Sequence, residues 1–212
     1  MKKTAFSLLG AVLLLVTACG ERGNGVVTSQ SRPLSDFTHL EVVGEYQVQW
    51  TPGSPAFKVT ADENLLPHIT AIATGPMLII DSDVQLSPTQ PITIILSSPL
   101  LNNLGLTGSP RIRADGLSGP AFKITSAGDG DITLSGEVRD LDVTLTGNAS
   151  LHAHSLRTRT AEMILTGSPI ALIAVSRSLE ATITGDGRLV YTGNPRKVTK
   201  TIAGSGAVIR TP

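Results

Sequence analysis

The feature that most constrains this 212-residue chain is a glycine-centred turn that returns at a nearly constant interval. Six copies lie 18 to 20 residues apart across the C-terminal half: Thr107-Gly108-Ser109, Ala127-Gly128-Asp129, Thr146-Gly147-Asn148, Thr166-Gly167-Ser168, Thr184-Gly185-Asp186 and Ala203-Gly204-Ser205. A fixed period of this size indicates one structural unit stacked on copies of itself, rather than glycines scattered among loops.

Apolar residues keep a fixed position relative to each glycine. The second residue before the glycine and the fourth after it are apolar in nearly every copy, and they alternate with polar residues. Alternation with period two is typical of strands, because successive side chains point to opposite faces. We therefore assign the columns that contain Leu145, Leu151, Leu165 and Ile183 to the core.

The predicted fold class is all-β, a single-stranded parallel β-helix or β-solenoid with coils of 18 to 20 residues, expected to be right-handed. Each coil should hold two or three short strands. The glycine fits a bend that needs positive φ or close packing between coils. A β-sandwich with a strand about every 8–12 residues is the structural alternative, although it would not require the glycine phase to persist.

The N-terminus resembles a bacterial lipoprotein signal. A basic start at Met1-Lys2-Lys3 precedes an apolar run that is too short for a comfortable membrane span. The run ends in Val16-Thr17-Ala18-Cys19-Gly20, like a lipobox, and Cys19 is the only cysteine of the chain. The resemblance implies cleavage before Cys19, lipidation of its sulfur and a membrane anchor, on the outer membrane if the source is Gram-negative. A plain cleaved signal with an incidental cysteine is the alternative.

These patterns predict a simple domain organisation. Residues 1–18 form the signal peptide, and residues 19–32 form the lipidated cysteine and a flexible polar tether. Residues 33–212 form one domain, in which 33–103 are less regular and 104–212 hold the repeats.

Three segments of the N-terminal half carry a family resemblance. They are Gly44-Glu45-Tyr46-Gln47-Val48, the run Thr60-Ala61-Asp62-Glu63-Asn64-Leu65-Leu66-Pro67, and Gly75-Pro76-Met77-Leu78-Ile79-Ile80. With the Gly-Ser and Gly-Asp-Gly turns that follow, the chain resembles the putative auto-transporter adhesins with a head GIN domain over roughly residues 36–210. The resemblance implies a secreted or envelope-attached bacterial β-solenoid without an established activity, and the family's name implies adhesion.

The sequence offers little for catalysis, metals or cofactors. His152 and His154 lie two apart on an outward strand face, and two histidines do not supply the three or four ligands that zinc needs. Aspartates beside the turn glycines lack the nine-residue period of a calcium-binding β-roll. Glu162 and Glu180 are expected one coil apart, but acids are sparse, so we assign no catalytic residue and no cofactor.

A threonine-rich strip is the candidate binding face. The outward positions one and three residues before the glycines hold eight threonines, namely Thr107, Thr125, Thr144, Thr146, Thr166, Thr182, Thr184 and Thr201. In stacked coils these would present hydroxyls and methyls to a glycan or an envelope protein. Gly105 and Ile164 interrupt the strip, which argues against ice binding.

The leading hypothesis is therefore a lipid-anchored adhesin-like or scaffold module that does not catalyse a reaction. The alternatives are a polysaccharide-processing enzyme and an interaction or sensing module of an envelope complex. Acids or bases gathered in one groove would favour the enzyme, whereas an even polar face would favour recognition. The formal net charge of zero gives no support for a nucleic-acid partner.

Overall fold

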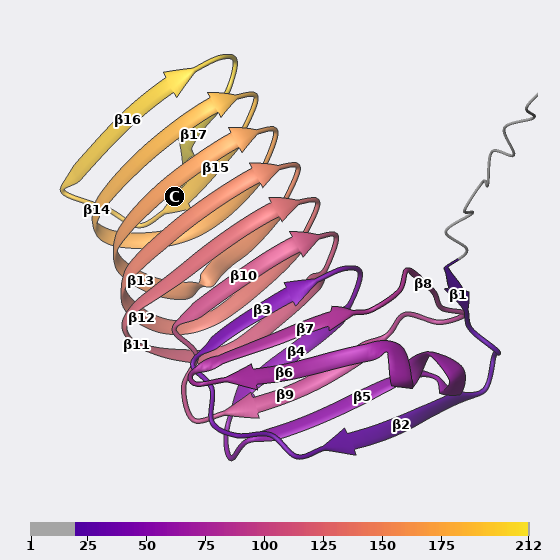
Figure 1. Ribbon diagram of the computed structural model, residues 1–212. Helices are drawn as coiled ribbons and strands as arrows, with labels where there is room; N and C mark the ends of the chain where they lie inside the picture. Colours follow the sequence, from indigo (N-terminus) through magenta and orange to yellow (C-terminus); the bar gives the residue numbers. More distant parts are fainter. Residues whose placement is uncertain (1–19, 212) are drawn as a thin grey trace, which may run out of the picture.

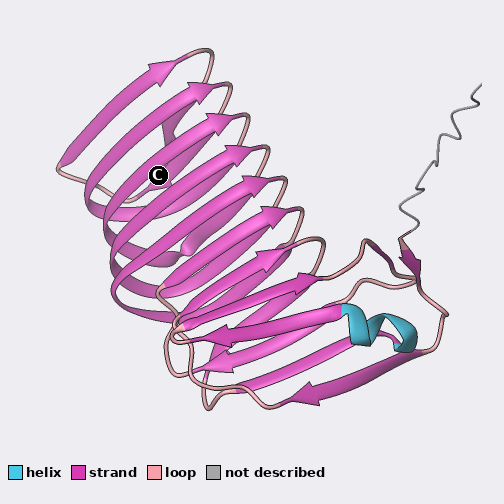
Figure 2. Ribbon diagram, in the orientation of Figure 1, coloured by secondary structure: helices cyan, strands magenta, loops and turns pink. Residues whose placement is uncertain are grey.

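The computed structural model describes residues 20–211, which fold almost entirely into strands (Figures 1 and 2). The predicted signal peptide and the predicted lipidation site Cys19 lie outside this range. The strands are β1 (Glu21–Arg22), β2 (Val27–Arg32), β3 (His39–Val43), β4 (Gln47–Pro52), β5 (Ala56–Asp62), β6 (Ile69–Thr74), β7 (Met77–Ser82), β8 (Leu86–Ser87), β9 (Thr93–Ser98), β10 (Asn103–Gly108), β11 (Arg111–Gly128), β12 (Asp131–Gly147), β13 (Ser150–Gly167), β14 (Ile170–Gly185), β15 (Arg188–Thr192), β16 (Lys197–Ala203) and β17 (Ala207–Arg210). A 3-10 helix, η1 (Glu63–His68), lies between β5 and β6. Within the described residues, no helix has the length and apolar character needed to span a membrane.

From β10 onward the chain winds as a stack of parallel coils, which confirms the predicted β-solenoid (Figure 1). Strands β11 to β14 are 16 to 18 residues long, and each pairs with the next one coil further on. The sequence predicted two or three short strands per coil. Backbone pairing instead continues around the corners, where the register shifts between Ala114 and Leu117 and between Ala153 and Arg157.

Each coil contributes to three faces. The front sheet approaches the glycine turns and comprises residues 103–108, 121–128, 140–147, 160–167, 178–185 and 197–204. The rear sheet follows the turns and comprises residues 111–114, 131–134, 150–153, 170–173, 188–191 and 207–210. The side sheet joins the two through residues 117–120, 136–139, 156–159 and 174–177.

The predicted inward columns form the core. Leu145, Leu151, Leu165 and Ile183 are all fully buried. Ser126 occupies an inward position between Leu106 and Leu145, where its buried hydroxyl has no hydrogen-bond partner. Burial ends at the last coil because no described strand stacks on β16, and Ile202 there is 42% exposed.

The recurring glycine has a steric cause. Gly147 has φ +107°, and a Cβ on it would lie 2.6 Å from the carbonyl oxygen of Gly128 in the preceding coil. The amide of Asn148 donates to that same oxygen at 3.1 Å. Gly44 is an earlier member of this column, because it lies next to Gly108 and has φ +118°. The long insertion between the two hides it from a search for a 20-residue period.

Coils at the N-terminal end do not follow sequence order. Strand β3 pairs with β10 on one side and β7 on the other, and β4 likewise pairs with β11 and β9. The coil built from β7 and β9 therefore lies outside the coil built from β3 and β4. Antiparallel pairs β2–β5, β5–β9 and β6–β7 close this end of the solenoid (Figure 1).

The described part of the predicted tether, residues 20–32, is ordered structure, which corrects that prediction. Strand β1 pairs with β8, and β2 pairs antiparallel with β5. The guanidinium of Arg32 donates to the carbonyls of Leu66 and Ile69. A polar, glycine-rich composition is typical of linkers. Pairing at a sheet edge uses backbone N–H and C=O groups, however, and polar residues and glycine carry these as well.

Candidate functional site

The structure brings the eight predicted threonines together on the front sheet. Strand register places Thr125, Thr144, Thr182 and Thr201 in one column, with Gly105 and Ile164 as its other members. A second column two residues further along the strands holds Thr107, Thr146, Thr166 and Thr184, together with Ala127 and Ala203. Neighbouring members are about 4.7–4.9 Å apart along the stack, as in any paired sheet.

The hydroxyls of these columns are available to a partner on the part of the chain that the structure describes. Thr144 and Thr182 are half-buried and the other six are exposed. Within residues 20–211 none of the eight makes a side-chain hydrogen bond, whereas Thr158 and Thr160 on the same coils do. The two columns thus offer a regular array of donors, acceptors and methyl groups to an outside partner.

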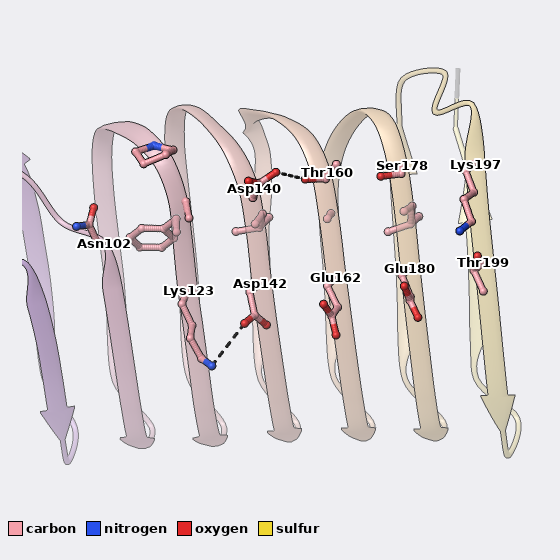
Figure 3. Close-up of a pocket in the computed structure, with 16 residues that line it drawn as sticks. Asn102, Lys123, Asp140, Asp142, Thr160, Glu162, Ser178, Glu180, Lys197 and Thr199 are labelled. Atoms are coloured by element: carbon pink, nitrogen blue, oxygen red, sulfur yellow. Dashed lines mark hydrogen bonds and ion pairs between the residues drawn. The ribbon is translucent and has the colours of Figure 1, made fainter.

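A polar groove continues the front sheet beyond the threonines (Figure 3). Its volume is about 560 Å³. One column along it holds Lys123, Asp142, Glu162, Glu180 and Thr199, and the next holds Ala121, Asp140, Thr160, Ser178 and Lys197. The sequence placed Glu162 and Glu180 one coil apart but did not predict a groove. Counting five residues back from each turn glycine would have found the whole acidic column.

Contacts inside the groove are short and local. Lys123 Nζ lies 3.5 Å from Asp142 Oδ2. Asp140 accepts hydrogen bonds from the Thr160 hydroxyl and from Arg139 Nε, and these bonds hold its pKa below the usual range. Asp140 is therefore a charged acceptor that cannot serve as a general acid near neutral pH.

The acidic column does not have the geometry of a glycosidase site. Hydrolysis needs two carboxyl groups that flank the scissile bond from opposite sides. Asp142, Glu162 and Glu180 instead form one row on successive coils, as Figure 3 shows. A row of this kind suits binding along the stack better than attack across it.

The aspartates beside the turn glycines, considered above as calcium ligands, accept hydrogen bonds from the next coil. Asn148 donates to Asp129 at 2.9 Å one coil away, and Ser205 donates to Asp186 in the same manner. His152 lies 3.8 Å from Asp131, and His154 is exposed. In the part of the chain that the structure describes, no three such side chains converge in a way that could hold a metal ion.

Exposed Phe, Tyr and Trp rings are missing from the described surface. Residues 20–211 contain six such side chains, all at most 6% exposed: Phe37, Tyr46, Trp50, Phe57, Phe122 and Tyr191. Stacking of a sugar or a base on an exposed Phe, Tyr or Trp ring is therefore not available on this part of the molecule. Recognition has to rely on hydrogen bonds, charges and small apolar groups.

Comparisons with known proteins give a family from the sequence and similar folds from solved structures. Residues 36–195 match the family described as "putative auto-transporter adhesin, head GIN domain". A putative adhesin of Bacteroides fragilis superposes with a TM-score of 0.72 at 16% identity, covering 91% of this chain and 100% of its own. A putative adhesin of Parabacteroides merdae (20% identity) and a putative lipid binding protein of Parabacteroides distasonis (21%) each give 0.52, covering 91% of this chain and 99% of theirs. A search of curated proteins finds no significant match.

Proposed function

Because the chain belongs to the head GIN domain family of putative auto-transporter adhesins, we propose that its front sheet is a recognition surface for a glycan or an envelope protein. The family assignment and the similar structures support a non-catalytic, adhesin-like role at the cell envelope. The observation that carries the proposal is the double column of threonines whose hydroxyls have no partner within the described residues.

The geometry favours an extended partner. The columns run along the stack through every coil from β10 to β16, so equivalent groups repeat at each coil. A polymer strand or an exposed sheet edge can meet such a surface at several points at once, and weak contacts then add up. A small compact ligand would use only a fraction of it.

We further propose that Cys19 carries the lipid anchor. Two or three acyl chains hold a protein stably on a membrane, whereas one chain is marginal. Gly20 and β1 follow directly, and the amide of Glu21 donates to the carbonyl of Gln85 at 2.7 Å. The antiparallel end of the solenoid would then stand next to the membrane, with the front sheet running away from it.

The front-sheet proposal is tested with two double variants of equal charge. Thr146→Lys with Thr184→Lys changes two exposed members of one column, and Thr51→Lys with Thr74→Lys changes two exposed threonines elsewhere. Both should fold, because all four side chains are exposed. Binding on a glycan array and in an envelope pull-down should be lost by the first variant and kept by the second. Equal binding by both variants would overturn the proposal.

The enzyme alternative has its own measurement. If the acidic row processed polysaccharide, the protein would release new chain ends from a bound glycan, and Glu162→Gln with Glu180→Gln would stop the release. We expect binding without any such release. Turnover that depends on these two carboxylates would contradict the adhesin-like role and support the enzyme alternative.

A further inference from the structure

Positive charge is concentrated at one end of a chain whose formal net charge is zero. Residues 187–212 contain five Lys or Arg and no Asp or Glu. Residues 20–100, which include the closed end of the solenoid, contain three basic and eight acidic residues. The molecule is thus electrically polarised along its axis, and its open end is basic.

A column of arginines leads to this basic end. Asp140, Thr160, Ser178 and Lys197 stack on successive coils, and the residue before each of them is an arginine, although the strand register shifts beside Arg159, between Thr158 and Thr160. Those residues are the arginine column: Arg139, Arg159, Arg177 and Arg196. All four are exposed at the corner between the side and front sheets, and the amide of Arg196 donates to the carbonyl of Arg177 at 2.8 Å.

Most of this charge is uncompensated. Arg139 Nε lies 2.8 Å from Asp140, whose charge also interacts with Arg159. Within residues 20–211, Arg159, Arg177 and Arg196 take part in no ion pair. The acids Asp142, Glu162 and Glu180 belong to a separate column further along the front sheet. Like charges stacked at coil spacing repel one another, so the column lowers stability unless an anion lies against it.

A shallow groove runs beside the arginine column on the side sheet. Its volume is about 670 Å³, and it reaches from Ser118 to Gly193 across successive coils. Arg139 and Arg159 line it together with Arg157, which pairs with Glu137 at 3.3 Å. The groove therefore provides room along the same axis as the charges.

We propose that the arginine column binds a linear acidic polysaccharide whose strand lies along the solenoid axis. Guanidinium groups match carboxylate and sulfate oxygens in bidentate geometry, and each coil carries one, on strands that lie about 4.8 Å apart. That spacing is close to the length of one sugar unit in an extended glycan. Single-stranded nucleic acid fits less well, because its binding sites stack bases on exposed Phe, Tyr or Trp rings, which the described surface lacks.

This inference shares with the front-sheet proposal only the premise that the protein acts by recognition. The arginine column and the threonine columns are different surfaces. Loss of binding by the lysine variants at Thr146 and Thr184 would therefore leave the arginine column untested, and the reverse also holds. Each proposal can fail alone.

The test uses the full mature chain and a defined probe. Binding of an oligogalacturonate, of its methyl-esterified neutral counterpart and of a single-stranded oligonucleotide of equal charge is measured by titration calorimetry. The test variant replaces Arg159, Arg177 and Arg196 with Gln. The control variant replaces Arg111, Arg113 and Arg188 with Gln, which removes the same charge from the rear sheet.

We expect the acidic oligosaccharide to bind the wild type and the control, and the test variant to bind it at least about tenfold more weakly, or about 1.4 kcal/mol. Affinity should also fall as salt rises. Equal binding of the neutral counterpart, or equal loss in both variants, would overturn the arginine column as the site. Tighter binding of the oligonucleotide would overturn the glycan assignment.

Discussion

At the scale of single residues, the glycine column sets the fold. Each turn glycine has a positive φ. In addition, a carbonyl of the previous coil lies close to the place that a Cβ would occupy. Both conditions exclude other residues, so the sequence repeats glycine even where neighbouring positions vary among Ser, Asp and Asn. The sequence predicted this constraint correctly, because a steric requirement that only glycine meets places glycine at the same point of every coil.

Gly147→Ala tests the constraint. The new Cβ would lie 2.6 Å from the Gly128 oxygen in a conformation that alanine rarely adopts. We expect a loss of at least about 3 kcal/mol in the free energy of unfolding, measured with urea. Gly53→Ala is the matched control, because its Cβ would meet only Ser97 at an ordinary 3.6 Å. A loss below 1 kcal/mol, or equal effects of both changes, would contradict the steric explanation.

At the scale of elements, the closed end depends on one buried carboxylate. Asp62 at the end of β5 is fully buried and accepts hydrogen bonds from the Thr89 hydroxyl and amide and from the Gly25 amide. Those bonds connect the chain before β2 with the loop before β9. They lower the pKa of Asp62, in spite of its burial, so the ionised form stabilises the folded state.

This arrangement predicts an acid-sensitive end. A carboxylate whose pKa is lowered by folding contributes stability above its unfolded pKa, and the contribution is lost as pH falls through the folded value. Asp62→Asn should therefore be less stable than the wild type at pH 7, and the difference should shrink below about pH 4. Urea unfolding across this range measures it, with exposed Asp36→Asn as control. A difference that does not change with pH would count against the ionised Asp62.

At this same scale, some elements could be predicted from the sequence and others could not. The period and the alternation predicted the core columns, because positions that are buried in every coil require apolar side chains in every repeat. The acidic column was accessible by the same counting, as Lys123, Asp142, Glu162 and Glu180 share one phase. The order of the first coils and the pairing of β2 could not be predicted in this way. Both depend on backbone contacts across insertions, which produce no periodic pattern in the sequence.

At the scale of the whole molecule, the two ends differ in structure and in charge. Antiparallel strands seal the N-terminal end, where Gly20 follows the candidate lipidation site. The last coil, formed by β16 and β17, has no strand stacked on it among the described residues, and it carries Lys197, Lys200 and Arg210. Basic side chains on an exposed edge oppose pairing with a second copy of that edge.

Cys19→Ala tests the proposed anchor at the sealed end. We expect the variant to leave the membrane fraction and to lose labelling by a palmitate analogue, because the proposed anchor is a lipid bonded to the sulfur that the substitution removes. The thermal stability of residues 20–211 should not change. Membrane attachment or labelling that survives the substitution would contradict anchoring through Cys19.

The coil order at the sealed end has a consequence for length. Since antiparallel strands occupy one end, new coils can join the register only between β10 and the open end. Gain or loss of one repeat of 18 to 20 residues would lengthen or shorten every surface column by one member and leave the rest in place. The length of the solenoid along its axis therefore changes in whole coils, and the number of glycines in the column counts them.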